Sequence, residues 1–176
     1  MKKYNLAILV DNKPGVLTHV SGLISRRAFN IESISAGYTE EQDITRINIE
    51  VSVQDQHELE QVVNQLSKLI DIIKIVNLGL VDSIIRELVL IKVRANKESL
   101  PDIRNIVEIF RGKIVDVSPE NVVIELTGSQ SKIDAICDML AQFEIIELAR
   151  TGTLAMSRGP IPVKEMDVDH TCQCHD

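Results

Sequence analysis

The chain has 176 residues, of which 44% are hydrophobic, and it carries a formal net charge of −7. This length fits one domain or two small ones, and the apolar content excludes wholesale disorder. The negative charge argues against a general affinity for nucleic acid or for an anionic membrane. No apolar run approaches the roughly 18 residues that a membrane-spanning helix needs, and no signal-peptide pattern is found, so we expect a cytoplasmic protein.

The first half of the chain predicts six elements in the order strand, helix, strand, strand, helix, strand. The strands are expected over residues 4–10, 30–38, 44–53 and 72–80, and the helices over 16–27 and after Asp55. Asp55 and Glu58 form a capping box at the start of the second helix. The strand 44–53 alternates between apolar residues and the polar set Arg46, Asn48, Glu50 and Ser52. This alternation predicts a sheet that is covered on one face only.

The second half repeats the same order of elements. A strand is expected over 86–95, a helix capped by Ser99, a hairpin around the turn PEN, a helix over 129–141 and a final strand in FEIIELART. The pattern predicts an α+β protein with two ferredoxin-like βαββαβ units in tandem, whose antiparallel sheets carry their helices on one face. We expect domains at 1–80 and 84–157, followed by a flexible tail at 158–176.

Little in the sequence points to catalysis. There is no P-loop, HExxH or GxSxG motif, and neither His19 nor His57 has a partner at a telling spacing. Cys137 falls on an apolar helix stripe, which favours an inert core thiol. We therefore expect no catalytic residue on this chain.

The C-terminal tail contains four potential soft-metal ligands within six residues: His170, Cys172, Cys174 and His175. Zinc sites usually space their cysteines as C-x₂₋₄-C, and the C-x-C spacing here is tighter. Incidental ligands in a tail are the favoured interpretation, with a metal site as a weak alternative.

The segment DNKPGVL at residues 11–17 leaves a strand and enters a helix directly. A helix start exposes unpaired N–H groups at the positive end of the helix dipole, where a carboxylate can bind. Gly15 would let a ligand approach the backbone closely, and Asn12 supplies an amide that can donate and accept. The alternative is a plain turn, for which Pro, Gly and Asn are ordinary residues. The matching segment of the second half, ANKESLPDI, has no glycine at the bend.

Several segments carry a resemblance to a known family. They are DNKPGVL, ISRRAFNIESIS, TRINIEV, EIFRGKIVDVSP and LARTGTLAMSRG, in this order. Over residues 3–159 the chain resembles the small regulatory subunit of acetohydroxyacid synthase (acetolactate synthase), with an ACT domain in its first half and an ACT-like domain in its second.

The resemblance implies a noncatalytic partner in branched-chain amino acid biosynthesis. Such a subunit forms a homodimer through its ACT domains, activates the large catalytic subunit and confers feedback inhibition by valine, leucine or isoleucine. Thiamine diphosphate, Mg and FAD are then expected only on the catalytic partner. One chain would contribute Asn12, Gly15, Val16 and Leu17 to the effector site, and the facing chain would contribute Asn30 and Ile31. The alternatives are a free-standing tandem ACT sensor that regulates another enzyme or a transcription factor, and a small enzyme, which the empty catalytic inventory disfavours.

Overall fold

The computed structural model describes residues 1–27 and 29–166, and these form two compact units. The first unit contains residues 1–84 together with 153–166, and the second contains residues 85–152. The sequence places the domains at 1–80 and 84–157, whereas the second compact unit spans residues 85–152 and the chain returns to the first unit at Thr153.

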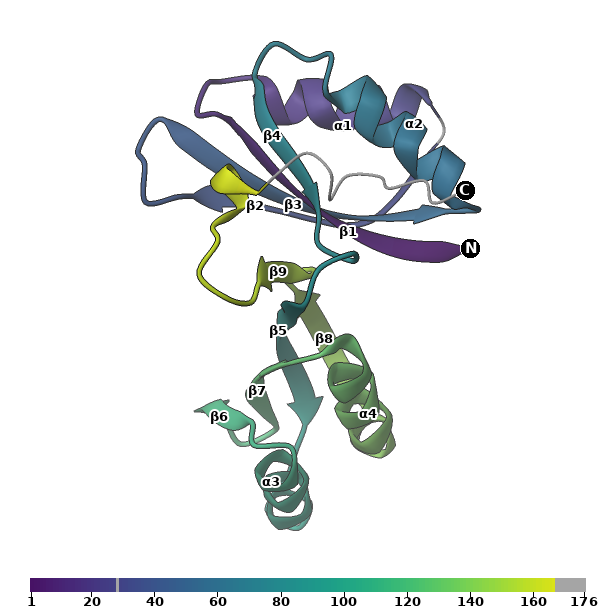
Figure 1. Ribbon diagram of the computed structural model, residues 1–176. Coiled ribbons are helices and arrows are strands. Elements are labelled where there is room, and N and C mark those ends of the chain that lie inside the picture. The colour runs from purple at the N-terminus through teal and green to yellow at the C-terminus, as the bar shows by residue number, and fades with distance from the viewer. Residues whose placement is uncertain (28, 167–176) are drawn as a thin grey trace. The chain divides into compact units, whose positions relative to one another are not determined.

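The first unit is built on an antiparallel sheet with the strand order β2-β3-β1-β4. Its strands are β1 (Lys2–Asp11), β2 (Asn30–Tyr38), β3 (Ile44–Val53) and β4 (Ile72–Asn77). Two helices, α1 (Val16–Arg26) and α2 (Gln56–Leu66), cover one face of this sheet (Figure 1). The central strands point Ile8, Ile47 and Ile49 into the core between sheet and helices. The predicted βαββαβ order is therefore confirmed for this unit.

The capping box predicted for α2 is confirmed in its first part. The Asp55 side chain accepts a hydrogen bond from the Glu58 N–H at 2.9 Å, which satisfies one of the unpaired donors of the first turn. The Glu58 carboxylate accepts from the N–H of Gln54 at 2.5 Å, one residue before the expected partner. Both ends of the box thus fix where β3 stops and α2 begins.

The prediction that the second face of this sheet is bare is wrong. Asn48, Glu50 and Ser52 are all more than 90% buried. The returning segment, which contains the short strand β9 (Leu154–Ser157, paired with β5, Ser83–Arg94) and the 3-10 turn η2 (Val163–Glu165), contacts this face, because Thr153 bonds to Asn5 and Ser33, the cross-strand neighbours of Glu50. The alternation in β3 showed which residues face away from the helices, but it carried no information on what lies over them.

Polar contacts join the returning segment to the sheet. The Thr153 hydroxyl lies 3.1 Å from that of Ser33 and donates to Asn5 Oδ1 at 3.0 Å. Val163 and Met166 are buried, at 5% and 7% exposure. Residues 158–166 of the expected flexible tail therefore pack on the first unit, and the remainder of that tail lies outside the described residues.

The second unit repeats the topology with the strand order β6-β7-β5-β8. Its strands are β5 (Ser83–Arg94, whose first two residues count with the first unit), β6 (Lys113–Val117), β7 (Asn121–Gly128) and β8 (Ile145–Arg150). Its helices are α3 (Leu100–Ile109), α4 (Gln130–Leu140) and the 3-10 turn η1 (Ala141–Phe143). Ile103, Val107, Ile133 and Ile136 pack with the inward residues of β5 and β7 in a separate core.

The predicted cap of α3 is wrong in its detail. Ser99 holds the N-cap position, but its side chain makes no capping bond to the helix. Its hydroxyl accepts instead from the Asn96 N–H at 2.9 Å. Asn96 Oδ1 in turn accepts from the N–H groups of Glu98 and Ser99, so the two side chains form a local turn before the helix.

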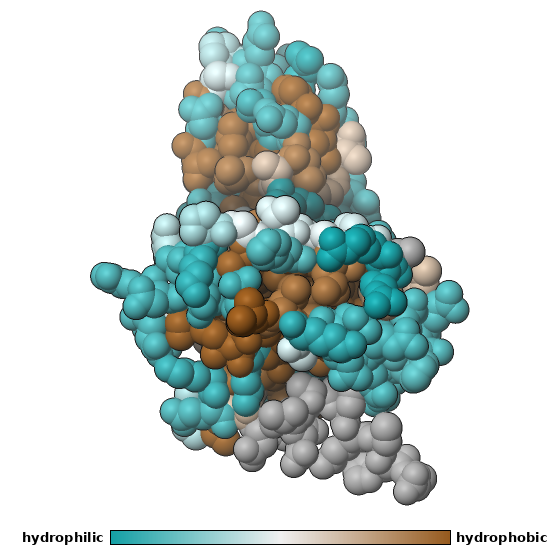
Figure 2. All heavy atoms as spheres, turned by 90° about the horizontal axis from the view of Figure 1, so that it is seen from above, coloured by the Kyte–Doolittle hydropathy of each residue, from teal (hydrophilic) through white to brown (hydrophobic). Residues whose placement is uncertain are grey.

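The surface of the molecule mixes polar and apolar areas. Figure 2 shows hydrophobic atoms reaching the surface in broad patches between hydrophilic ones. Within the described ranges, no helix is long and apolar enough to cross a bilayer.

Candidate functional site

The corner between β1 and α1 leaves the start of α1 open. Gly15 occupies the N-cap position with φ +91°, a left-handed conformation that favours glycine, and no side chain caps the helix. Among the described residues, none accepts a hydrogen bond from the N–H groups of Gly15, Leu17 and Thr18. The Val16 N–H makes only a long contact, 3.5 Å, to the Lys13 carbonyl. Three exposed donors therefore converge at the positive end of the helix dipole, as a carboxylate requires.

Asn12 shapes this corner from its other side. Its Nδ2 donates to the Gln42 carbonyl at 2.9 Å, and its Oδ1 accepts from the Thr45 hydroxyl at 3.1 Å. The side chain therefore ties the corner to the turn between β2 and β3. Asn12 still has one amide hydrogen free of these two bonds, but its first role here is to position the loop.

Val16 and Leu17, the two apolar residues of the corner, differ in exposure. Val16 is 4% exposed and belongs to the core, so only its backbone faces the corner. Leu17 is 46% exposed and presents an apolar side chain beside the free N–H groups. A small aliphatic group bound at this corner would thus contact Leu17 rather than Val16.

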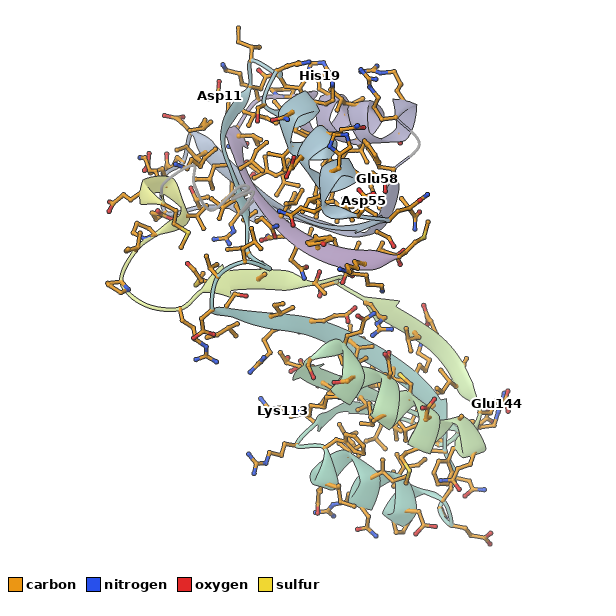
Figure 3. All side chains as sticks on the ribbon, turned by 45° about the vertical axis from the view of Figure 1, so that its right-hand side comes forward. Asp11, His19, Asp55, Glu58, Lys113 and Glu144 are labelled. Atoms are coloured by element: carbon orange, nitrogen blue, oxygen red, sulfur yellow. The ribbon has the colours of Figure 1, made fainter. Side chains whose placement is uncertain are left out.

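Asn30 and Ile31 lie at the opposite end of the same sheet. Asn30 pairs with Ser52 on β3, whereas the corner bonds to Thr45, seven positions earlier. At the rise of a strand this corresponds to roughly 23 Å. In Figure 3, Asp11 is labelled at one end of the first unit, and Asp55 and Glu58, which follow the far end of β3, are labelled at a distance from it. One chain therefore does not bring the two groups together.

The immediate surroundings of Asn30 and Ile31 are also defined. The Asn30 amide donates to Glu32 Oε1 at 2.6 Å, and Ile31 is partly buried against the core of the unit. Asn30 is exposed at the start of β2 and remains accessible to another chain.

Charged neighbours that the sequence reasoning missed surround the corner. Lys13 Nζ lies 2.5 Å from Asp11 Oδ2, and this hydrogen bond, with the attraction of the carboxylate, raises the pKa of Lys13. His19 Nδ1 lies 3.4 Å from Asp71 Oδ2. Asp71 comes from the distant start of β4, and no spacing in the sequence connects it with His19.

Comparison with known proteins supplies the family. Residues 6–74 match the family model described as the AHAS small subunit-like ACT domain, and residues 86–159 match that of the small subunit of acetolactate synthase. The acetolactate synthase small subunit of Mycolicibacterium smegmatis is 48% identical over 157 residues, which is 89% of this chain and 92% of the relative. The probable acetolactate synthase small subunit of Archaeoglobus fulgidus is also 48% identical, over 89% of this chain and 98% of its own.

The chain belongs to the acetolactate synthase small subunit family. Its fold agrees with that assignment. The crystal structure of the small subunit from Thermotoga maritima superposes with a TM-score of 0.83 at 40% identity, covering 92% of this chain and 100% of that one. Membership makes this chain the regulatory, ACT-containing partner of a separate catalytic subunit.

The second ACT-like unit of this family member has a corner of the same kind, but that corner is closed. Asn96 Oδ1 accepts from the N–H groups of Glu98 and Ser99, at 3.0 and 2.8 Å. The Leu100 N–H donates to the Asn96 carbonyl at 3.0 Å. The N–H of the N-cap residue, which is free at Gly15, is therefore bonded at Ser99, and the position of Leu17 is taken in α3 by Pro101, which has no N–H.

The remaining candidates do not add to a site. Burial raises the pKa of the Cys137 thiol, which keeps it in the less reactive neutral form. In the part of the chain that the structure describes, no three His, Cys, Asp or Glu side chains gather as a metal site. The tail ligands His170, Cys172, Cys174 and His175 lie outside the described residues.

Proposed function

We propose that this chain activates the thiamine-diphosphate-dependent catalytic subunit and makes it sensitive to feedback inhibition by valine, or by leucine or isoleucine. The observation that carries the proposal is the uncapped start of α1 at Gly15, whose N–H is free, whereas the N–H of Ser99 at the matching position of the second unit is bonded to Asn96. Thiamine diphosphate, Mg and FAD belong, on this proposal, to the catalytic partner.

The chemistry of the corner suits an α-amino acid. The free N–H groups of Gly15, Leu17 and Thr18 can receive the α-carboxylate, and Leu17 offers an apolar contact for the side chain. An apolar pocket separates ligands that differ by one methylene by only about 1–3 kcal/mol. Valine, leucine and isoleucine should therefore all bind, with modest differences in affinity.

The proposed site needs two chains. Within one chain, Asn30 lies at the far end of β3 from the corner. A homodimer through the first units can place the Asn30 of one chain opposite the Gly15 corner of the other, where the Asn30 amide can hold the polar end of the effector. The effector then bridges two subunits and biases the dimer toward one arrangement. Inhibition follows if the catalytic subunit has different activity with the free and the liganded dimer.

Substitution of Gly15 tests the corner. Gly15→Asp is expected to abolish valine inhibition of the reconstituted enzyme, because it places a negative charge at the carboxylate site, while activation of the catalytic subunit survives. Gly15→Asn is the matched control, since Asn tolerates a positive φ and adds no charge, and it should weaken inhibition less. Undiminished inhibition in Gly15→Asp would remove the corner from the site.

Mixed dimers test the two-chain arrangement. Gly15→Asp and Asn30→Ala should each impair both sites of a homodimer. In a heterodimer of the two variants, one site carries both substitutions and the other carries neither. An equal mixture forms heterodimers in about half of the dimers, so mixing should restore about a quarter of the wild-type valine binding measured by calorimetry. If mixing restores nothing, the two residues do not meet across the dimer.

The match of both halves to this family favours the small-subunit role over a free-standing ACT sensor. Co-purification with the catalytic subunit separates the two roles.

A further inference from the structure

A pocket separate from the Gly15 corner lies on the face of the first sheet that α1 and α2 do not cover. It encloses about 480 Å³ in the first unit. Leu9 and Arg46, neighbours across β1 and β3, form part of its lining. The end of β2 and the turn after it contribute residues 38–41, and the returning segment contributes residues 156–157 and 159–164. The corner residues Asn12, Gly15 and Leu17 are not among those that line it.

Arg46 supplies the charge of this pocket. Its Nε donates to Asn48 Oδ1 at 3.2 Å, and its Nη2 donates to the Ala155 carbonyl at 2.6 Å. Both acceptors are neutral, and within residues 1–27 and 29–166 no carboxylate lies at ion-pair distance from the guanidinium. Burial lowers the pKa of Arg46, against the attraction of Glu40. The side chain is thus fixed in place with its charge only partly compensated, which is unfavourable for a partly buried cation.

The other charges around the pocket limit what can bind. Glu41 is paired with Lys164 across the opening, and Glu40 is the remaining acid of the lining. Two carboxylates near the guanidinium disfavour a doubly charged anion such as phosphate. A single negative charge would be accepted by the Nη1 group of Arg46, which donates to none of the described residues.

The rest of the lining is mostly apolar. It includes Leu9, Ile44, Met156, Ile161 and Val163. A volume of this size with a few convergent polar groups is typical of small-molecule sites.

We propose that this pocket binds a small aliphatic monocarboxylic acid, with its carboxylate on the Arg46 guanidinium and its alkyl chain against Leu9, Ile44 and Met156. The site is separate from the corner at Gly15, and it does not depend on the regulatory role proposed above. A charge-assisted hydrogen bond from a fixed guanidinium gives the carboxylate its orientation.

Calorimetric titration of the full chain with isovalerate (3-methylbutanoate) tests the proposal, because this acid lacks the ammonium group of an amino-acid effector. The wild type should bind it saturably. Arg46→Gln should weaken binding by about tenfold or more, the measure of a hydrogen bond to a charged group. Met156→Glu should weaken it comparably by placing a negative charge in the lining.

Two controls make the result specific. Leu154→Glu introduces the same charge at another exposed position of β9, outside the pocket lining, and should bind like the wild type. Gly15→Asp should also bind isovalerate normally. No binding to the wild type, or equal binding to the wild type and Met156→Glu, would overturn the proposal. Loss of binding in Gly15→Asp alone would place the acid at the corner and overturn it as well.

Discussion

At the scale of single residues, the corner depends on one backbone conformation. Gly15 has φ +91°, and a Cβ built at that position meets no atom within 4 Å. A side chain at this position would be disfavoured only by the positive φ of the backbone, since the space beside it is open. The same openness is what allows a ligand to reach the free N–H groups. Gly15 is therefore needed for the backbone conformation of the corner, and it also leaves the proposed binding site open.

Gly15→Ala should lower the free energy of unfolding by about 1 kcal/mol, the cost of holding an L-residue in the left-handed region. Gly22→Ala is the matched control, because Gly22 lies inside α1 with equally open space and no positive φ. It should raise stability by about 0.5 to 1 kcal/mol through the better helix propensity of alanine. Urea denaturation of both variants measures the difference. Equal effects of the two substitutions would contradict the strain argument.

At the scale of elements, the second unit is held by an ion-pair cluster that joins two strands and a helix. Arg150 on β8 donates from Nε to Glu87 Oε1 at 2.9 Å and from Nη2 to Glu87 Oε2 at 3.1 Å. The same Nη2 lies 3.0 Å from Asp134 Oδ1 on α4. Glu87 on β5 is only 6% exposed. Because the Glu87 carboxylate is desolvated, the stability of the second unit depends on its ion pair with the Arg150 guanidinium.

Arg150→Met should destabilise the second unit by about 3 kcal/mol, because it leaves Glu87 buried without its cation. The double substitution Glu87→Met with Arg150→Met should recover most of that loss, since it removes both charges. Hydrogen exchange of the β5 amides between Val89 and Val93 reports the stability of this unit. A double variant as unstable as the single one would show that shape, rather than charge, decides the effect.

At the scale of the whole molecule, the chain does not follow its sequence repeat to the end. The second unit stops at Gly152, and residues 153–166 return to the first unit. There they bond to Arg46, Ser33 and Asn5 on the face of the sheet opposite the helices, and they form one side of the pocket around Arg46. Val163 secures the end of this segment at 5% exposure, whereas Ile161 nearby is 54% exposed.

Val163→Asp should release the returning segment, because a carboxylate at this position would be buried without a partner. Limited proteolysis should then cleave within residues 153–166 several times faster than in the wild type. Ile161→Asp adds the same charge at an exposed position and should leave the cleavage rate unchanged. Equal rates in Val163→Asp and the wild type would show that this residue does not hold the segment.

Much of this architecture was predictable from local signals. The alternation of β3, the cap of Asp55 on α2 and the apolar stripes of the four helices each depend on neighbouring residues, and they determined two βαββαβ units with helices on one face. The glycine at the corner was equally readable, because a strand that turns directly into a helix at Pro-Gly restricts the backbone there.

Only the tertiary structure determined which residues distant in sequence contact each other. Thr153 bonds to residues 33 and 5, and His19 faces Asp71; no period or spacing links such distant positions. Asn12 and Asn96 occupy matching corners. The Asn12 side chain donates to a carbonyl in the turn between β2 and β3, whereas the Asn96 side chain accepts from an N–H group at the start of its own helix. The physical reason is that a pattern records which side of an element is apolar, whereas the partner of a polar side chain is fixed only when the whole chain packs.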